Sequence, residues 1–395
     1  MCSSDLDCLA GKSGIGPITK LDPTGYKTRI AAEVPPLTDI EEKFDPKLLK
    51  RADPFAQYSL YATKVALDDS GLVIDASNRD DIGVLIGSGI GGMETWERQH
   101  QILLERGPSR VSPFLVPMMI IDMASGLISI EFGARGPNLA VVTACASGTH
   151  ALGEAAEIIR RGMAKAMISG GAEAAVTSTA LSGFCSAGAL SERNDEPTTA
   201  CRPFDRTHDG FVIGEGATTM ILEDLEFARA RGANILGELV GYGMSGDAYH
   251  ITAPDTSGDG AARAMKAALK QAKLNAEDIA YVNAHAPGTP NGDDMEATAL
   301  TRVFAPGSDG PLVSSTKSIH GHQLGATGAT ELGLTLRMLK EGVVPATLNC
   351  NDPQDCVQSD VVMGEHREFK GKAGMSNSFG FGGHNAVLIV KLMED

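Results

Sequence analysis

The sequence predicts an α/β protein in which mostly parallel β-sheets are covered by helices on both faces. Several short runs of Val, Ile and Leu are apolar throughout rather than alternating, which is typical of strands buried on both faces. Helical patterns lie between these runs, and this alternation of strands and helices indicates α/β layering. The 46 glycines among 395 residues also favour close approaches between backbone segments.

The predicted elements alternate along the whole chain. The strands are Ile82–Ile86, Leu139–Thr143, Ala166–Ser169, Thr218–Leu222, Ala280–Asn283, Leu312–Ser315 and Asn385–Val390, and the helices include His150–Arg161, Gly260–Ala272 and Ala329–Lys340. One series ends near Ala228–Ala233 and another begins with Ile235–Val240, so we expect two halves, residues 1–232 and 233–395. Internal identity supports a duplication only weakly. The long polar loop Arg193–Gly210 is expected to be functional.

Composition and charge exclude several classes of protein. The net charge of −16 argues against nucleic acid or an anionic membrane as the main partner. No charge-free apolar run has transmembrane length, and Met1–Cys8 lacks the basic start and apolar stretch of a secretory signal. The seven cysteines show no CxxC spacing, which indicates reduced thiols and a cytoplasmic location.

Cys145 is a candidate nucleophile. It follows the apolar run Leu139–Thr143 and precedes a helical pattern, so it is expected at a strand-to-helix turn. The free N–H groups and the positive end of the helix dipole favour a thiolate at such a position. From this stretch alone, a buried core cysteine is an equally good interpretation.

Two histidines are expected near Cys145. His285 directly follows a predicted strand, and His322 lies in a glycine-flanked loop between a strand and a helix. Open α/β sheets place ligands at the carboxyl ends of their strands, where all three residues fall. Lys317 and Glu331 flank His322 in the sequence. A buried ion pair between them would hold the histidine loop and keep the imidazole neutral.

Six motifs together resemble the β-ketoacyl-acyl-carrier-protein synthases, the condensing enzymes of fatty-acid synthesis, in their type II form. The resemblance runs from about Ala10 to the C-terminus, with the motifs in the family's order. They are TACASG around Cys145, Ala189–Ala217, SGDAYHITAP at Ser245–Pro254, NAHAPGTP around His285, STKSIHGHQLGATGATE around His322, and NSFGFGGHN at Asn377–Asn385. The family's opening strand and glycine-rich turn have no counterpart, and Met1–Cys8 match nothing in it. We therefore expect reduced stability in the chain as given.

The resemblance implies a fold and a reaction. The fold is the thiolase fold, with two similar halves in a five-layer αβαβα sandwich, usually as a homodimer. The reaction transfers an acyl group from an acyl carrier protein to the cysteine; malonyl-carrier protein then loses CO2, and its carbanion attacks the thioester. Neither a cofactor nor a metal is implied.

The resemblance also assigns roles to matching residues. Cys145 matches the nucleophile, His285 and His322 match the catalytic histidines, Lys317 and Glu331 match the supporting pair, Phe381 matches the gating residue whose N–H joins that of Cys145 in the oxyanion hole, and Phe379 matches a neighbouring aromatic of that loop. Ile120 matches the floor of the acyl pocket.

Some positions depart from the family pattern. Pro287 stands where a threonine usually bonds the pantetheine arm, although Thr289 remains. Ala253 replaces a common serine beside Thr252, and Asp122 replaces a common asparagine. These changes affect the expected pantetheine contacts rather than the catalytic trio.

Other residues near the expected site have two interpretations each. Asp247 and His250 either contact the pantetheine arm or brace a loop, and His384 is expected to support the Phe381 loop. Cys185 and Cys201 flank the long loop and are expected to be inert.

Two motifs suggest other ligands only weakly. Gly87–Gly92 follows a strand but lacks the spacing of a dinucleotide loop, so a packing turn is favoured. His320 lies near His322, but no cysteine or carboxylate occurs at ligand spacing along the chain, so no metal is expected.

Three rival functions remain open. A degradative thiolase would need a second cysteine near the C-terminus, where the chain reads Gly-Phe-Gly-Gly-His. A non-catalytic chain-length or scaffold partner of a synthase would typically lack the cysteine that is present as Cys145, and Pro287 is its best support. A polyketide-type ketosynthase would differ only in its substrates.

Docking of an acidic carrier protein onto an acidic chain requires a local basic patch. The candidates are Arg51, Arg193, Arg202 and Arg206. Such docking is expected to weaken as the salt concentration rises.

Overall fold

The computed structural model describes residues 8–393 and contains two main β-sheets. The four-stranded sheet has the order β4 (Asn138–Val141), β3 (Ile82–Gly87), β5 (Ala166–Glu173), β6 (Gly216–Glu223). The six-stranded sheet has the order β11 (Ser359–Val361), β9 (Gly307–Ser314), β8 (Ile279–Asn283), β13 (Ala373–Gly380), β14 (His384–Lys391), β7 (Glu238–Gly246). Strands β4, β3 and β5 run parallel, as do β11, β9, β8 and β13, whereas β6, β14 and β7 pair antiparallel with their neighbours.

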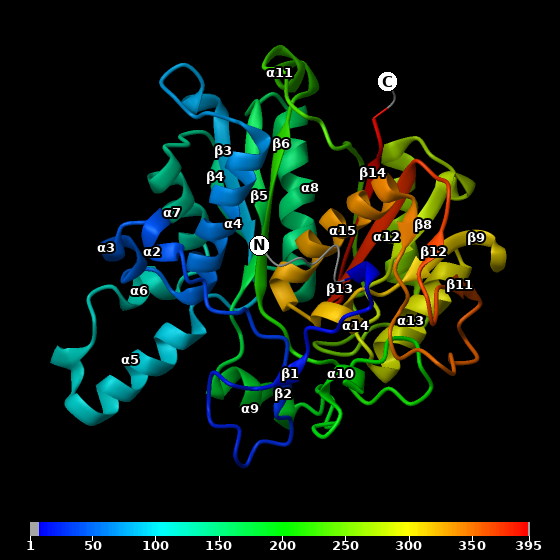
Figure 1. Cartoon of the computed structure of the whole chain (residues 1–395), viewed down its shortest axis with the longest axis horizontal. Coiled ribbons are helices and arrows are strands. Elements are labelled where there is room, and N and C mark those ends of the chain that lie inside the picture. The colour runs from blue at the N-terminus through cyan, green and yellow to red at the C-terminus, as the bar shows by residue number, and fades with distance from the viewer. Residues whose placement is uncertain (1–7, 394–395) are drawn as a thin grey trace.

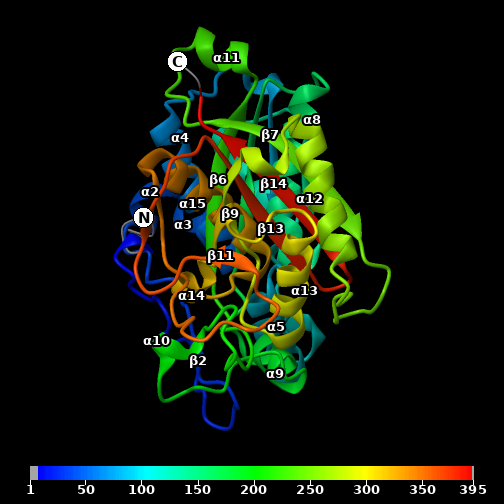
Figure 2. The same cartoon turned by 90° about the vertical axis from the view of Figure 1, so that its right-hand side faces the viewer.

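The two sheets sandwich a central layer of two helices, α8 (Ser147–Arg160) and α15 (Thr327–Glu341) (Figure 1). Helices α4 (Pro54–Ser70) and α7 (Met123–Phe132) cover the outer face of the four-stranded sheet. Helices α12 (Asp259–Ala272) and α13 (Pro290–Thr301) lie on the outer side of the six-stranded sheet, as Figure 2 also shows. This is the αβαβα arrangement of the thiolase fold, so the predicted fold class is confirmed.

The remaining elements are short or peripheral. They are α2 (Ile40–Lys43), α3 (Pro46–Leu49), α5 (Met93–Arg106), α6 (Leu115–Met119), α9 (Ser178–Ser186), α10 (Pro197–Ala200), α11 (Leu225–Ala230), α14 (Lys317–His320), and the two-stranded ribbons of β1 (Gly16–Pro17) with β2 (Ile30–Ala31) and β10 (Val343–Val344) with β12 (Arg367–Glu368). No helix among residues 8–393 is both long and apolar enough to cross a membrane.

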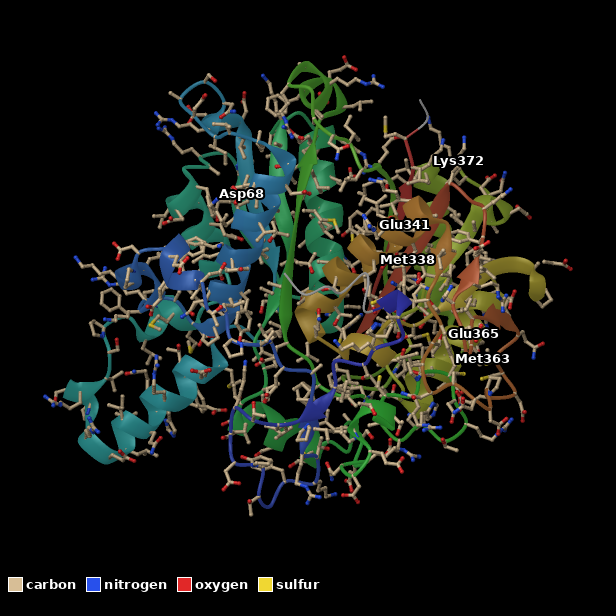
Figure 3. All side chains as sticks on the ribbon, in the orientation of Figure 1. Asp68, Met338, Glu341, Met363, Glu365 and Lys372 are labelled. Carbon is tan, nitrogen blue, oxygen red and sulfur yellow. The ribbon has the colours of Figure 1, made fainter. Side chains whose placement is uncertain are left out.

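Local sequence signals define the helix ends. The Asp53 side chain accepts a hydrogen bond from the Phe55 N–H, Pro54 begins α4, and Gly71 ends it at φ +64°. On α15, Met338 is fully buried whereas Glu341 is exposed one turn later (Figure 3). The buried face of each helix therefore follows the apolar periodicity read from the sequence.

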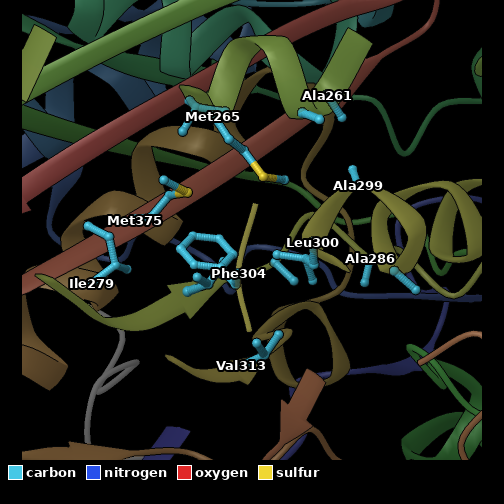
Figure 4. Close-up of a cluster of buried hydrophobic side chains, with 14 of the residues drawn as sticks. Ala261, Met265, Ile279, Ala286, Ala299, Leu300, Phe304, Val313 and Met375 are labelled. Carbon is cyan, nitrogen blue, oxygen red and sulfur yellow. The ribbon is translucent and has the colours of Figure 1, made fainter. Parts of the chain in front are cut away.

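A large apolar cluster fills the space between the six-stranded sheet and its outer helices (Figure 4). Met265 of α12 and Leu300 of α13 pack there with Met375 of β13 and Val313 of β9. A second cluster lies beneath α4 and α7. Helices thus cover both faces of each sheet, as the apolar strands predicted, and the edge strand β4 is the least buried of the four-stranded sheet.

The two central helices approach each other through glycine. A Cβ atom on Gly148 would lie 2.8 Å from the carbonyl oxygen of Gly325, and one on Gly328 would lie 1.9 Å from Thr149 Oγ1. Larger residues at these positions would push the helices apart. Because the segments that precede α8 and α15 carry the site described below, this close packing sets the distance between the two halves of the site.

The duplication that is faint in the sequence is visible in the fold. The order β4-β3-β5-β6 corresponds to β9-β8-β13-β14, with the same parallel and antiparallel pairings. Each central helix follows a 3₁₀ turn, Ala144–Ala146 or Leu324–Ala326, whose first residue has a positive φ (+50° and +48°). The two halves therefore present equivalent turns to each other.

All seven predicted strands are present, with ends that differ from the prediction by up to five residues. In the six-stranded sheet β11 was not predicted, and neither was β13. Its sequence, AGMSNSFG, is rich in small and polar residues, and its burial comes from the neighbouring strands β8 and β14. The outer edge of β6 has no partner strand within residues 8–393. The unmatched segment Met1–Cys8 falls outside the described residues except for Cys8, which is buried.

Candidate active site

The fold brings three distant residues together. Cys145 lies in the turn between β4 and α8, His285 follows β8, and His322 lies between α14 and the turn before α15. The Cys145 sulfur and one ring nitrogen of each histidine all lie within 4.8 Å of one another. The two imidazole rings are nearly perpendicular, with centroids 5.3 Å apart. A thiol and two imidazoles therefore face one small space.

The turn that carries Cys145 is strained and firmly held. Ala144 has a φ of +50°, which is costly for a residue with a Cβ atom. The Ser147 hydroxyl donates to the Ala144 carbonyl oxygen at 2.7 Å and accepts from the Thr143 N–H at 2.9 Å. This arrangement fixes the direction of the Cys145 side chain before any substrate binds.

Burial keeps the Cys145 thiol protonated. It raises the thiol pKa to about 11, and this effect outweighs the nearby Lys317 charge and the Phe381 N–H directed at the sulfur. This raised pKa opposes the thiolate expected from the helix end. Attack on a substrate requires the thiol to pass its proton on, and the two imidazoles are the nearest groups that can accept it.

Both histidines are neutral at physiological pH. Burial, followed by the positive charge of Lys317, lowers the pKa of His285 and His322 well below 6.5. A neutral imidazole carries one N–H donor and one acceptor nitrogen. In His322, Nδ1 is hydrogen-bonded to Thr327 Oγ1 at 3.0 Å, which leaves Nε2 as the free nitrogen.

The rate of Cys145 alkylation by iodoacetamide is expected to rise about tenfold per pH unit between pH 7 and 9. Because the pKa of the thiol is raised to about 11, the thiolate is scarce at pH 7 and increases with pH throughout this range. The measurement is the alkylation rate of the peptide containing Cys145, followed by mass spectrometry against free glutathione. An inflection near pH 6.5 or below would instead reveal a thiolate–imidazolium pair and contradict the assignment.

Lys317 and Glu331 form the predicted buried ion pair. Both side chains are fully buried, and Lys317 Nζ lies 2.5 Å from Glu331 Oε1. Lys317 begins α14 and Glu331 lies in α15, so the pair ties together the two ends of the loop that carries His322.

The loop Gly380–Gly383 closes one side of the site. A Cβ atom on Gly380 would lie 2.7 Å from the Thr143 carbonyl oxygen, so only glycine allows the loop to lie this close to the Cys145 turn. The Phe379 ring lies 5.8 Å from the His285 ring, and Phe381 is 38% exposed. The position of the Phe381 N–H beside the sulfur agrees with the role that the resemblance implies.

Asp247 braces this loop. Its N–H donates to the Gly383 carbonyl oxygen at 2.9 Å, and its carboxylate accepts from Asn385 Nδ2 at 2.6 Å and from the Asp255 N–H at 3.2 Å. His250 Nδ1 accepts from the Thr252 N–H at 3.2 Å within the same exposed segment. The loop-bracing interpretation of Asp247 is therefore the one that its contacts support.

Other predicted residues lie around the trio rather than in it. Ile120 is 37% exposed at the end of α6, and Thr289 precedes α13, with its N–H donating to Asp293. The Pro287 carbonyl oxygen faces the Cys201 sulfur at 3.9 Å. The His384 ring lies against Gly382, beside the Phe381 loop.

Sequence reasoning missed three residues that support the site. Phe211 packs edge-on against His322, with ring centroids 5.1 Å apart. Glu296 accepts from the backbone N–H groups of His285 and Ala286 at 3.0 and 2.6 Å. Glu173 is the third. It is the only acidic residue in the strand AMISGGAE, and a lone acid in an otherwise uncharged strand is a signal in the sequence that the residue supports a site.

The Glu173 carboxylate joins the two halves of the site. One oxygen accepts from the Gly89 N–H at 2.7 Å and the Gly325 N–H at 3.0 Å, and the other accepts from Ser88 Oγ and the N–H groups of Ile90 and Gly91. Gly325 follows His322 by three residues, and Gly89 contacts the Cys145 turn through Ala144. Glu173 therefore sets the histidine loop against the nucleophile turn.

Replacing Glu173 with glutamine is expected to destabilise the protein by about 1–3 kcal/mol. In the wild-type protein, the Gly89 and Gly325 N–H groups donate to the same carboxylate oxygen. A glutamine NH2 group in that position is a donor and cannot accept these two hydrogen bonds. The check is the shift of the urea unfolding midpoint, with the exposed substitution Glu105→Gln as the control. Equal midpoints for the two variants would contradict the assigned role.

Comparisons with known proteins identify the family. Residues 7–228 match the model of the β-ketoacyl synthase N-terminal domain, and residues 236–351 match that of its C-terminal domain. The chain belongs to the β-ketoacyl synthase family. The 3-oxoacyl-[acyl-carrier-protein] synthase 2 of Staphylococcus aureus (strain COL) is 48% identical over 388 residues, covering 98% of this chain and 93% of that protein.

Solved structures of the family agree with this assignment. A β-ketoacyl synthase from Burkholderia phymatum matches with a TM-score of 0.92 and 36% identity, over 99% of this chain and 95% of the other. A type II polyketide ketosynthase solved with its acyl-carrier protein matches with a TM-score of 0.88 and 28% identity, over 98% and 94%. The expected family is confirmed, and a degradative thiolase is not needed to explain the site.

Proposed function

We propose that this protein catalyses the decarboxylative Claisen condensation of an acyl thioester, held on Cys145, with malonyl-acyl-carrier protein in fatty-acid elongation. The observation that carries the proposal is the meeting of one thiol with two neutral imidazoles in a β-ketoacyl synthase fold. The proposal includes a division into a nucleophile half, residues 1–232, and a histidine half, residues 233–395, and it is supported by the position of Cys145 in the first and of both histidines in the second.

The first step loads the acyl group. The Cys145 sulfur attacks the thioester carbonyl of acyl-carrier protein, a new carbon–sulfur bond forms, and the bond to the carrier sulfur breaks. The thiol proton leaves through a neighbouring imidazole and reaches the departing carrier thiolate. We assign the N–H groups of Cys145 and Phe381, which lie beside the sulfur, to stabilising the oxyanion of this step.

The second step forms the new carbon–carbon bond. Malonyl-carrier protein loses CO2, and negative charge develops on its thioester oxygen. His285 and His322 each offer one N–H donor to this oxygen without a metal. The carbanion attacks the acyl group, the carbon–sulfur bond to Cys145 breaks, and the released thiolate takes a proton from solvent through a neighbouring imidazole.

Mass spectrometry of the intact protein after incubation with acyl-carrier protein tests the first step. The wild-type protein should gain one acyl group, and Cys145→Ala should gain none. An unmodified wild-type protein would point to the non-catalytic scaffold alternative. The likeness to the solved polyketide ketosynthase supports a second candidate function, a polyketide-type ketosynthase. Profiling of acyl and extender substrates separates it from fatty-acid elongation.

The same proposal includes a cytoplasmic enzyme that docks an acyl carrier protein. The six cysteines from Cys8 onward are all free thiols, which fits a reducing compartment. Of the candidate docking arginines, three face carboxylates: Arg193 faces Asp209, Arg202 faces Asp205, and Arg206 faces Asp352 and Asp355. Arg51 lies over the Phe114 ring, 4.5 Å from its centroid, and is the best placed of the four.

A homodimer through the edge strand β4 is part of the proposal. Within the described residues β4 pairs only with β3, and Leu139 and Val142 at its open edge are 38% and 53% exposed. Two β4 strands related by a twofold axis can pair antiparallel, which would join the four-stranded sheets and cover these apolar side chains.

Changing Val142 to aspartate is therefore expected to convert the dimer to a monomer. A charge at the paired edge would be buried without a partner. Light scattering after size-exclusion chromatography measures the mass. The control is Val73→Asp, because Val73 is 71% exposed near the opposite end of the sheet. A wild-type protein that is already monomeric, or a dimer that survives Val142→Asp, would contradict this interface.

A further inference from the structure

The catalytic trio also has the donor set of a zinc site. Cys145 Sγ and one nitrogen each of His285 and His322 lie within 4.8 Å of one another. Zinc binds cysteine sulfur at about 2.3 Å and histidine nitrogen at about 2.0–2.1 Å. Donor atoms around a tetrahedral ion are then about 3.5 Å apart, so each side chain needs to move by less than about 1 Å.

The surroundings suit a bound divalent cation. His322 Nδ1 is 3.0 Å from Thr327 Oγ1. Metal binding selects the tautomer in which Nδ1 carries the proton and donates it to this hydroxyl, in place of the Nε2–H tautomer used in condensation, and this leaves the Nε2 lone pair free to bind. The positive charge of Lys317 acts on both imidazoles and opposes a second cation, and its ion pair with Glu331 at 2.5 Å reduces this opposition. Three protein ligands leave the fourth position of the ion to water.

We propose that Cys145, His285 and His322 bind one Zn²⁺ reversibly, and that the bound ion switches the enzyme off. In the binding step the Cys145 S–H bond breaks, a sulfur–zinc bond forms, and the proton leaves to solvent without any redox change. The metal then occupies the sulfur that must accept the acyl group and the nitrogens that must face the malonyl thioester. The inhibitory consequence rests on the proposed function, whereas the binding itself does not.

The sequence analysis argued against a metal because no cysteine lies close to the histidines along the chain. The fold removes that objection because it brings Cys145 from one half to two histidines of the other. Such a site would make the enzyme sensitive to free zinc, and acylation of Cys145 would protect against it.

Cobalt provides a readout that does not depend on catalysis. Co²⁺ added to the full-length protein is expected to bind with a stoichiometry of one and to give a near-ultraviolet thiolate-to-metal band. Zn²⁺ should displace it. Cys145→Ser should abolish the band, whereas Cys185→Ser, in the same apolar cluster, should leave it unchanged. Thr327→Val should weaken binding by about 10–100-fold while keeping the band, because it removes only the partner of His322.

The outcomes separate the two proposals. A cobalt band that survives Cys145→Ser, or no binding at millimolar Co²⁺, overturns the metal site. Binding of cobalt by a protein that acyl-carrier protein never acylates keeps the metal site and overturns the proposed function. Where both hold, Zn²⁺ should block acylation of Cys145, and a chelator should restore it.

Discussion

Replacing His322 with alanine is expected to lower the rate of condensation by about 10²–10³-fold while Cys145 still becomes fully acylated at the end point. In the proposed reaction, the imidazole supplies one of two N–H donors to the oxygen that gains charge as malonyl-carrier protein loses CO2. The strained Cys145 turn and the Phe381 N–H, which serve acylation, remain in place. Condensation is measured by product formation, and acylation by intact mass.

Two further variants make this result specific. His322→Gln places an amide N–H near the former Nε2 and should recover part of the lost rate. His320→Gln, in the same loop and bonded to Thr316 rather than facing Cys145, should keep most of the activity. If His320→Gln is as damaging as His322→Ala, or if His322→Ala lowers condensation by less than tenfold, the donor role is wrong.

The sequence predicted the site well where short motifs end strands. Cys145, His285 and His322 each follow an apolar run, and the carboxyl ends of those runs meet in the fold. The buried pairing of Lys317 with Glu331 was also predicted, since both flank the same loop.

What the sequence could not give depends on packing between the halves. Glu173 touches Gly325 only because two glycine-lined turns abut, and neither stretch signals this contact by itself. The raised pKa of the Cys145 thiol could not be predicted for the same reason: a helix end favours a thiolate, but burial, which appears only in the fold, raises the pKa to about 11. The distance between the trio's donor atoms likewise emerges only from tertiary structure.

Removing either partner of the Lys317–Glu331 pair is expected to destabilise the protein by about 3–5 kcal/mol. Both side chains are fully buried, so Lys317→Met leaves the carboxylate, and Glu331→Leu leaves the ammonium group, without a compensating charge. The check is the urea unfolding midpoint of each variant. Lys64→Met, which breaks the exposed pair with Asp68 (labelled in Figure 3), is the control and should change the midpoint little.

The double variant Lys317→Met/Glu331→Leu distinguishes charge from packing. Because neither charge is left buried alone, the double variant should be more stable than at least one single variant and less destabilised than their sum. Its histidines should also change, since the positive charge of Lys317 helps to hold the pKa of His285 and His322 low. In Lys317→Met the pKa of both rings should rise. The loss of condensation rate at low pH, which follows protonation of the histidines, should therefore begin at a higher pH. If the losses in stability are additive and the condensation rate falls at the same low pH as in the wild-type protein, the pair acts only by filling space.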